Sequence, residues 1–174
     1  MTVNDRVTLR AASSADAGAL YRLISSNIAA GHLLPRRLDE ITVHASRFVV
    51  AVCRRTIIGC AELAPLSGQL AEVRSLAVED SARGQRIGTQ LVAEIHLRAR
   101  RAGYERLCVL THAPAYFLNF GFSIVPHLWV QEKVFTDCVN CPKFRTCGQF
   151  AMVVPLEPWQ ASEQDEAAAV LHYA

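Results

Sequence analysis

The segment LAVEDSARGQRIGTQLV, residues 76–92, constrains the fold of this chain more than any other stretch of its sequence. An apolar strand end is followed by a polar turn and then by residues 88–102, whose apolar side chains recur at helical spacing. The turn holds two arginines and two glycines, which are Arg83, Gly84, Arg86 and Gly88. A helix start exposes unpaired N–H groups and the positive end of the helix dipole, and glycine lets a ligand approach the backbone closely. The junction therefore predicts either a cradle for a diphosphate or a surface turn with two solvated arginines.

The composition is that of a globular protein and excludes several classes. The 174 residues suit one domain, and 51% apolar and 20% charged residues are ordinary values. A net charge of +2 is too balanced for a nucleic-acid binder, and no apolar run is long enough to cross a bilayer. The N-terminal segment lacks the apolar core of an export signal. We therefore expect a cytoplasmic protein whose six cysteines are thiols or metal ligands.

Apolar periodicity predicts an α/β chain with a mixed sheet. The expected strands cover residues 7–10, 47–53, 57–63, 69–78, 106–110, 122–125 and 150–154. The expected helices have their apolar faces in residues 17–28, 38–45, 88–102 and 113–120. Ser13 or Ser14 should cap the first helix and Gly31 should end it.

Two connections and one boundary follow from this order of elements. The strand–helix–strand unit at residues 70–110 should form a right-handed parallel crossover. Residues 47–53 and 57–63 should form a hairpin, although their turn lacks the Asn-Gly signal. Residues 1–156 are expected to form the domain, and residues 157–174, rich in Ala and Glu, a short helix or a loose tail.

The junction resembles the motif Gln/Arg-x-x-Gly-x-Gly/Ala of the GCN5-related N-acetyltransferase (GNAT) superfamily. Its three defined positions are occupied by Arg83, Arg86 and Gly88, with Arg86 where the family usually has glycine. A positive φ at that position would not be easily tolerated by arginine. The resemblance implies the GNAT fold, a mixed and mostly antiparallel sheet flanked by helices, with acetyl-coenzyme A (acetyl-CoA) as co-substrate. It assigns the pantetheine arm to Leu76, Ala77 and Val78, and the diphosphate to Arg83, Gly84, Gln85, Arg86, Ile87, Gly88 and Thr89.

Four further stretches resemble the stand-alone bacterial N-acetylglutamate synthases. They are LLPRRLDEI (33–41), AEVRSLAV (71–78), LTHAPAYFLNFGF (110–122) and EKVFTDCVNCPKFRTC (132–147). The resemblance implies transfer of an acetyl group to the α-amine of L-glutamate, the first step of arginine biosynthesis. Members of the family commonly form homodimers, and an enzyme of this pathway is an expected target of feedback by arginine.

The resemblance also implies an acceptor site built from Leu34, Arg36, Ser75 and Lys133. A dicarboxylate acceptor needs cations in fixed positions, and arginine can bind a carboxylate with both arms of its fork. Simple solvation of Arg36 and Lys133 is the alternative interpretation of the residues alone.

Glu72 aligns with a family glutamate suited to act as the base, directly or through water. Its alternative is a structural carboxylate paired with Arg74. Strict strand alternation would put Glu72 and Ser75 on opposite faces, and the β-bulge typical of this strand in the family would remove that conflict. The backbone N–H of Ala77 or Val78 would polarise the thioester carbonyl.

One departure concerns the acid that protonates the leaving thiolate. Many acetyltransferases have a tyrosine four residues before the glycine of the Gly-Phe element, and here that position is Phe117, with Tyr116 before it. A thiol leaves readily as a thiolate, so such an acid is dispensable, and Tyr116 is a weak candidate to replace it.

The spacing of Cys138, Cys141 and Cys147 leaves two interpretations open. A structural zinc site needs a fourth ligand, which His127 or Asp137 could supply. The alternative is a thiol cluster that packs or oxidises near the acceptor loop. Synthases resembling this chain often continue Cys-Asp-Glu where it has Cys147-Gly148-Gln149, which removes two acids from that corner. Cys53, Cys60 and Cys108 fall in strands and are expected in the core.

Three functions follow, in order of preference. The first is N-acetylglutamate synthesis by direct attack in a ternary complex, because no Cys or Ser is placed as a nucleophile beside a base. The second is acetylation of another amine, such as glutamine, a peptide N-terminus or a small-molecule amine. The third is a non-catalytic CoA-binding sensor.

Overall fold

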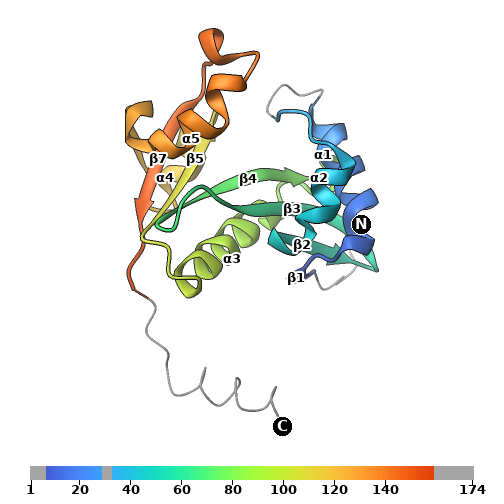
Figure 1. The fold of residues 1–174 in the computed structure, drawn as a ribbon. Coiled ribbons are helices and arrows are strands. Elements are labelled where there is room, and N and C mark those ends of the chain that lie inside the picture. The colour runs from blue at the N-terminus through green and yellow to red at the C-terminus, as the bar shows by residue number, and fades with distance from the viewer. Residues whose placement is uncertain (1–6, 29–32, 159–174) are drawn as a thin grey trace.

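The computed structural model of the protein describes residues 7–28 and 33–158 (Figure 1). These residues form one seven-stranded sheet in the order β1-β2-β3-β4-β5-β7-β6. The strands are β1 (Thr8–Ala11), β2 (Phe48–Cys53), β3 (Thr56–Pro65), β4 (Leu70–Val78), β5 (Arg106–Thr111), β6 (Ser123–Val125) and β7 (Phe150–Pro155). The α-helices are α1 (Ala17–Ile28), α2 (Leu38–Val43), α3 (Ile87–Arg101), α4 (Pro114–Leu118) and α5 (Gln131–Thr136).

Only β4 and β5 pair in parallel, and every other neighbouring pair in the described sheet is antiparallel. The predicted fold class, a mixed and mostly antiparallel sheet flanked by helices, is confirmed. No helix among the described residues has the length and apolar character needed to cross a membrane.

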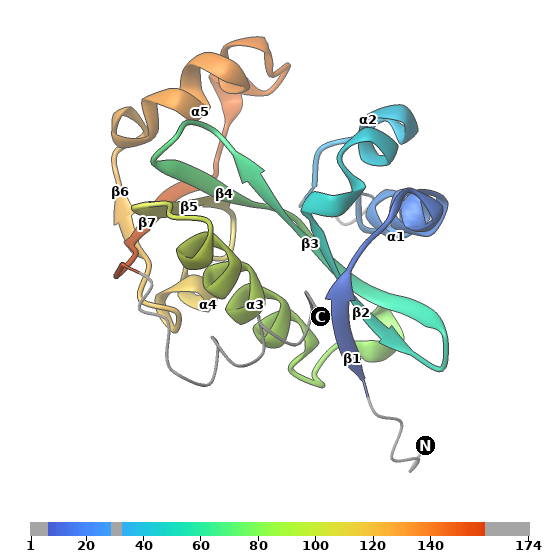
Figure 2. The same cartoon turned by 60° about the horizontal axis from the view of Figure 1, so that its bottom comes forward.

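Helices cover both faces of the β2–β4 part of the sheet (Figure 2). The buried side chains of α3 are Ile87, Leu91, Val92, Ile95 and Ala99, and they pack against one face. The α1–α2 pair covers the other face with Leu20, Leu23, Ile24 and Ile41. Alternate residues of the strands belong to the two cores, as Val49 and Val50 of β2 illustrate, because successive side chains of a strand point to opposite faces.

The functional region depends on how β4 leaves its neighbour β5. The two strands pair only from Leu70 to Glu72 of β4, and then diverge, so the rest of that β4 edge has no β5 partner (Figure 1). On its other edge β4 pairs with β3, and the register shifts by one residue between Cys60 and Glu62. Ser75 lies in this bulge with φ of 52°, a left-handed conformation that is uncommon for residues other than glycine. The bulge expected from the resemblance is therefore present.

Some details of the structure differ from the features predicted from the sequence. Arg54 and Arg55 both have positive φ, as a two-residue hairpin turn requires, although no Asn-Gly signal marks them. Cys60 and Cys108 are buried as expected, but Cys53 is only half-buried because it lies at the end of β2. Helix α5 was not predicted. Gly31 and almost all of the 157–174 tail lie outside the described residues.

Candidate active site

The junction between β4 and α3 has the geometry of an anion cradle. A single 3₁₀ turn, η3 (Asp80–Ala82), follows β4, and Gly84 and Arg86 then both have positive φ, of 77° and 60°. No side chain caps α3, and its first helical hydrogen bond is the one that Gln90 N–H donates to Arg86 C=O at 3.0 Å. The N–H groups of the preceding turn therefore remain available to a ligand at the positive end of a 15-residue helix.

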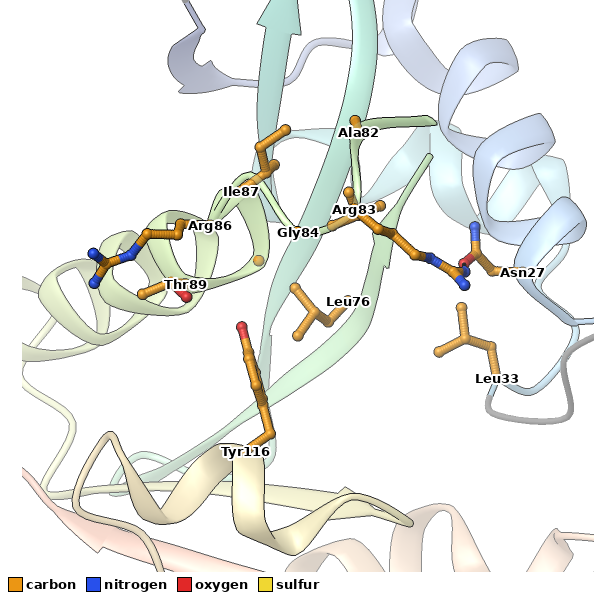
Figure 3. Close-up of a pocket in the computed structure, with 12 residues that line it drawn as sticks. Asn27, Leu33, Leu76, Ala82, Arg83, Gly84, Arg86, Ile87, Thr89 and Tyr116 are labelled. Atoms are coloured by element: carbon orange, nitrogen blue, oxygen red, sulfur yellow. Dashed lines mark hydrogen bonds between the residues drawn. The ribbon is translucent and has the colours of Figure 1, made fainter. Parts of the chain in front are cut away.

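Arg86 corrects one expectation from the sequence. Its backbone adopts the left-handed conformation that arginine was expected to resist, with a side chain exposed to solvent and pointing away from the pocket (Figure 3). The cost of this conformation is about 1 kcal/mol, which the packing of α3 outweighs.

A pocket of about 480 Å³ lies beside this cradle (Figure 3). The residues assigned to the donor that line it are Leu76, Val78, Arg83, Gly84, Arg86, Ile87, Gly88 and Thr89. Ala77 and Gln85 do not line it. Arg83 Nη2 donates to Asn27 Oδ1 at 2.9 Å and so ties the loop to α1. Asn27 and Leu33 also line the pocket, and no local pattern in the sequence marked them.

Tyr116 places an unsatisfied hydroxyl in the same pocket. Its side chain extends from α4 toward the first turn of α3 (Figure 3), and its Oη is buried with no hydrogen-bond partner among the described residues. A Cβ atom on Gly88 would lie 2.8 Å from this oxygen, so the missing side chain of Gly88 makes room for it. A weak interaction with the Thr89 hydroxyl lowers the pKa of Tyr116, but burial outweighs it and raises the pKa overall, so the hydroxyl keeps its proton at neutral pH.

Strand alternation directs one amide of β4 into the open edge. Glu79 N–H donates to Ile58 C=O on β3 at 2.9 Å. Since successive strand amides point to opposite sides, the Val78 N–H points to the edge that β5 has left. The Ala77 N–H points toward β3, where Cys60 lies opposite it. Of the two amides proposed from the sequence to polarise a thioester, the geometry favours that of Val78.

A second pocket, of about 530 Å³, lies farther along β4, and Leu33 belongs to both pockets. All the residues assigned to the acceptor and to the base line it, namely Leu34, Arg36, Glu72, Ser75 and Lys133. Glu72 and Ser75 reach the same pocket because the bulge changes the alternation of β4 between them. Arg74 and Asp137 also line it, although the resemblance assigns neither residue to the acceptor.

Arg36 is fully engaged by carboxylates in this pocket. Its Nε and Nη2 contact Glu40 at 3.2 and 2.7 Å, and its Nη1 donates to the buried Glu62 and to Ser75 Oγ, each at 2.8 Å. Burial lowers the pKa of Arg36, but hydrogen bonds and charges from Glu40 and Glu62 outweigh it and raise the pKa overall. Arg36 therefore joins the chain before α2 to both β3 and β4.

The other charged groups form a cluster of four around β4. Glu72 Oε2 accepts from Arg74 Nε and from Lys133 Nζ, both at 2.8 Å. Asp137 Oδ2 contacts the same two cations, at 2.8 Å from Lys133 Nζ. The pairing of Glu72 with Arg74, which the sequence had offered as the structural alternative, is thus present together with a contact to Lys133.

The three cysteines of the 138–147 segment lie along the wall of the second pocket. All six cysteines of the chain are free. The described residues contain no group of three or more His, Cys, Asp or Glu side chains placed to hold a metal ion. Zinc binding by these cysteines therefore stays a prediction.

An unpaired strand edge, an anion cradle and a second pocket thus lie along the same strand, β4. The sequence matches the family described as acetyltransferase (GNAT) domain over residues 44–124. It is also 34% identical over 148 residues to an uncharacterized N-acetyltransferase of Chlorobaculum tepidum, covering 85% of this chain and 96% of that one. The chain belongs to the GNAT acetyltransferases, whose acetyl donor is acetyl-CoA.

Other relatives are named amino-acid acetyltransferases. The one from Aeromonas salmonicida is 34% identical over 116 residues, but this chain spans only 26% of its length. The one from Mycobacterium tuberculosis is 28% identical over 135 residues, which cover 77% of it.

Solved structures show the same fold. Rv2747 from Mycobacterium tuberculosis, in complex with CoA and NLQ, has a TM-score of 0.74 at 23% identity, covering 86% of this chain and 99% of that one. N-acetylglutamate synthase from Neisseria gonorrhoeae, complexed with coenzyme A and N-acetyl-glutamate, has a TM-score of 0.76 at 24% identity, covering 90% of this chain and 36% of that one. The resemblance to GNAT enzymes and to their N-acetylglutamate synthase branch is confirmed.

Replacing Arg86 by glycine should raise the free energy of unfolding by about 1 kcal/mol, because glycine adopts a positive φ without strain. Arg83→Gly is the comparison at a negative φ of −65°, and it should destabilise, since it also removes the hydrogen bond to Asn27. Urea denaturation measures both variants. Equal changes in the two would contradict the strain at Arg86.

Replacing Tyr116 by phenylalanine should raise the free energy of unfolding of the ligand-free protein by about 1 kcal/mol, because it removes a buried hydroxyl without a partner. The extra stabilisation that CoA gives should become smaller, since the ligand loses that hydroxyl as a partner. Thermal denaturation with and without CoA measures both effects, and Tyr21→Phe, at an exposed position, is the control. A less stable ligand-free Tyr116→Phe would show that the hydroxyl already has a partner.

Proposed function

We propose that the protein transfers the acetyl group of acetyl-CoA to the α-amino group of L-glutamate, as an N-acetylglutamate synthase does. The observation that carries the proposal is the pair of pockets that share Leu33 along one open edge of β4. One pocket has the features of a diphosphate site, and the other gathers the cations Arg36, Arg74 and Lys133. Donor and acceptor would therefore approach each other beside β4.

The donor would bind through the backbone. Its diphosphate would accept hydrogen bonds from the N–H groups at the start of α3, and its pantetheine arm would follow β4 from Leu76 to Val78. The Val78 N–H would donate to the thioester oxygen, on which negative charge builds when the amine attacks. Tyr116 Oη would find its missing partner in the bound donor.

The acceptor would bind through its carboxylates. Arg36 and Lys133 are assigned to them, and Ser75 and Leu34 would contact the rest of the molecule. Glu40, whose side chain is half-exposed, pairs with the Nε and Nη2 edge of Arg36. A substrate carboxylate would replace Glu40 at this edge. Relatives named amino-acid acetyltransferases, and the fold shared with a synthase solved with N-acetyl-glutamate, support this acceptor class.

Glu72 is the base of the proposed reaction. Both of its cationic partners contact Oε2, and we assign Oε1 to the acceptor ammonium, directly or through a water molecule. Once Glu72 has taken one proton from the ammonium, the neutral amine attacks the thioester carbon and a tetrahedral oxyanion forms against Val78. The nitrogen gives its second proton to solvent, and the C–S bond breaks as the carbonyl re-forms. The thiolate leaves, and Tyr116 or solvent returns a proton to it.

Glutamine is the second candidate acceptor, and one observation favours it. The three cations of the acceptor pocket contact four carboxylates of the chain itself, so these contacts leave no excess of positive charge. A site of this kind also accommodates an acceptor with a neutral side chain.

The wider biological assignment belongs to the same proposal. It comprises a catalytic domain at residues 1–156 with a separate tail, a role in arginine biosynthesis, a cytoplasmic location, a homodimer, and feedback by arginine. The rival is a CoA-binding sensor without catalysis.

Purified protein mixed with acetyl-CoA and single amino acids should release CoA thiol with L-glutamate and yield N-acetylglutamate. Arg36→Ala should raise the KM for glutamate about tenfold or more, because a charge-assisted carboxylate contact is lost. Arg37→Ala is the matched control, since this neighbouring arginine is exposed and pairs only with Asp39 in the described structure.

Two results would contradict the proposal. CoA binding without thiol release in the presence of any amine would identify a sensor. Equal KM values for the Arg36 and Arg37 variants would remove Arg36 from the acceptor site.

A further inference from the structure

Asp137 occupies a place in the acceptor pocket where a substrate carboxylate would be expected to bind. It lies at the C-terminal end of α5, and its Oδ2 accepts hydrogen bonds from Arg74 Nη2 and from Lys133 Nζ. Burial raises the pKa of Asp137, but the hydrogen bond from Lys133 and the charges of Lys133 and Arg74 lower it overall. Asp137 is therefore a carboxylate at neutral pH, placed between two cations of the pocket wall.

The two carboxylates that share these cations differ in how easily a ligand could replace them. Glu72 is fixed on β4, and its side chain is 5% exposed, whereas that of Asp137 is 38% exposed. Beyond Asp137 the chain continues into the single 3₁₀ turn η5 (Cys138–Asn140), without strand pairing to hold it. An incoming carboxylate can therefore exchange with Asp137 but not with Glu72.

The net charge of this cluster depends on Asp137. Arg74 and Lys133 contribute two positive charges, and Glu72 and Asp137 contribute two negative ones, so the cluster is neutral as it stands. Without Asp137 the same cluster has one uncompensated positive charge beside the pocket. A carboxylate is attracted to that charge, whereas a neutral carboxamide gains much less from it.

We infer that Asp137 is an internal competitor of the acceptor's side-chain carboxylate and that it sets how strongly the site prefers a dicarboxylate over a neutral amide. The inference rests on the proposed amino-acid acetyltransferase function. A dicarboxylate acceptor displaces Asp137 from Arg74 and Lys133, while an acceptor with a carboxamide end binds with Asp137 in place. Asp137 thus weakens glutamate binding and leaves glutamine binding nearly unchanged.

The test is the ratio of kcat/KM for L-glutamate to kcat/KM for L-glutamine. Asp137→Asn keeps the size of the side chain and removes its charge, so the ratio should rise about tenfold, mainly through a lower KM for glutamate. Asp137→Glu restores a carboxylate and should return the ratio toward that of the wild type. Glu94→Gln is the matched control, since it breaks a comparable half-exposed ion pair with Arg98 on α3, and it should leave the ratio unchanged.

Other outcomes separate the role of Asp137 from the function itself. An unchanged ratio in Asp137→Asn, or equal losses for both acceptors, would show that Asp137 only holds Lys133 in place and would overturn the inference. The same ratio in the Asp137→Asn and Asp137→Glu variants would also overturn it. If the wild type released thiol with neither amino acid, the proposed function would fail, and the inference with it.

Discussion

The loss of pairing between β4 and β5 after Glu72 is the constraint on which the rest of the structure depends. A buried strand edge needs partners for its N–H and C=O groups, and here the described chain supplies none beyond that point. The bulge at Ser75 then rotates the strand, so that Glu72 and Ser75 face one pocket while Leu76 and Val78 face the other. One interruption in the sheet thereby provides the free amide and both pockets.

Paired charges hold the two sides of this opening. Arg36 links the chain before α2 to Glu62 on β3 and Ser75 on β4. Lys133 and Asp137 link α5 to β4 from the opposite side. Buried charges are costly unless they are paired, and removing one partner leaves the other buried and unpaired. These contacts therefore fix the pocket wall more than they add stability. The same pairing leaves half-exposed carboxylates in positions that substrate carboxylates could take.

Local features of the sequence predicted the turn and the helix that line the first pocket. The glycines and arginines of residues 83–88 mark the turn, and the apolar stripe of α3 marks the helix. Long-range contacts were not predictable, because no periodicity records which residues meet. The contact of Gly88 with Tyr116, and that of Arg36 with Glu62, depend on how distant segments pack. Helix α5 escaped prediction because none of its six residues is buried, so no apolar stripe marks it.

Amide hydrogen exchange, resolved by residue with and without CoA, tests most directly that an open strand edge and an uncapped helix hold the acetyl donor. We expect CoA to slow exchange at Val78 and at the first turn of α3, from Ile87 to Thr89, while exchange at Ala77, whose amide points toward β3, stays unchanged. Unaltered exchange at both Val78 and the α3 turn with CoA at saturation would contradict it.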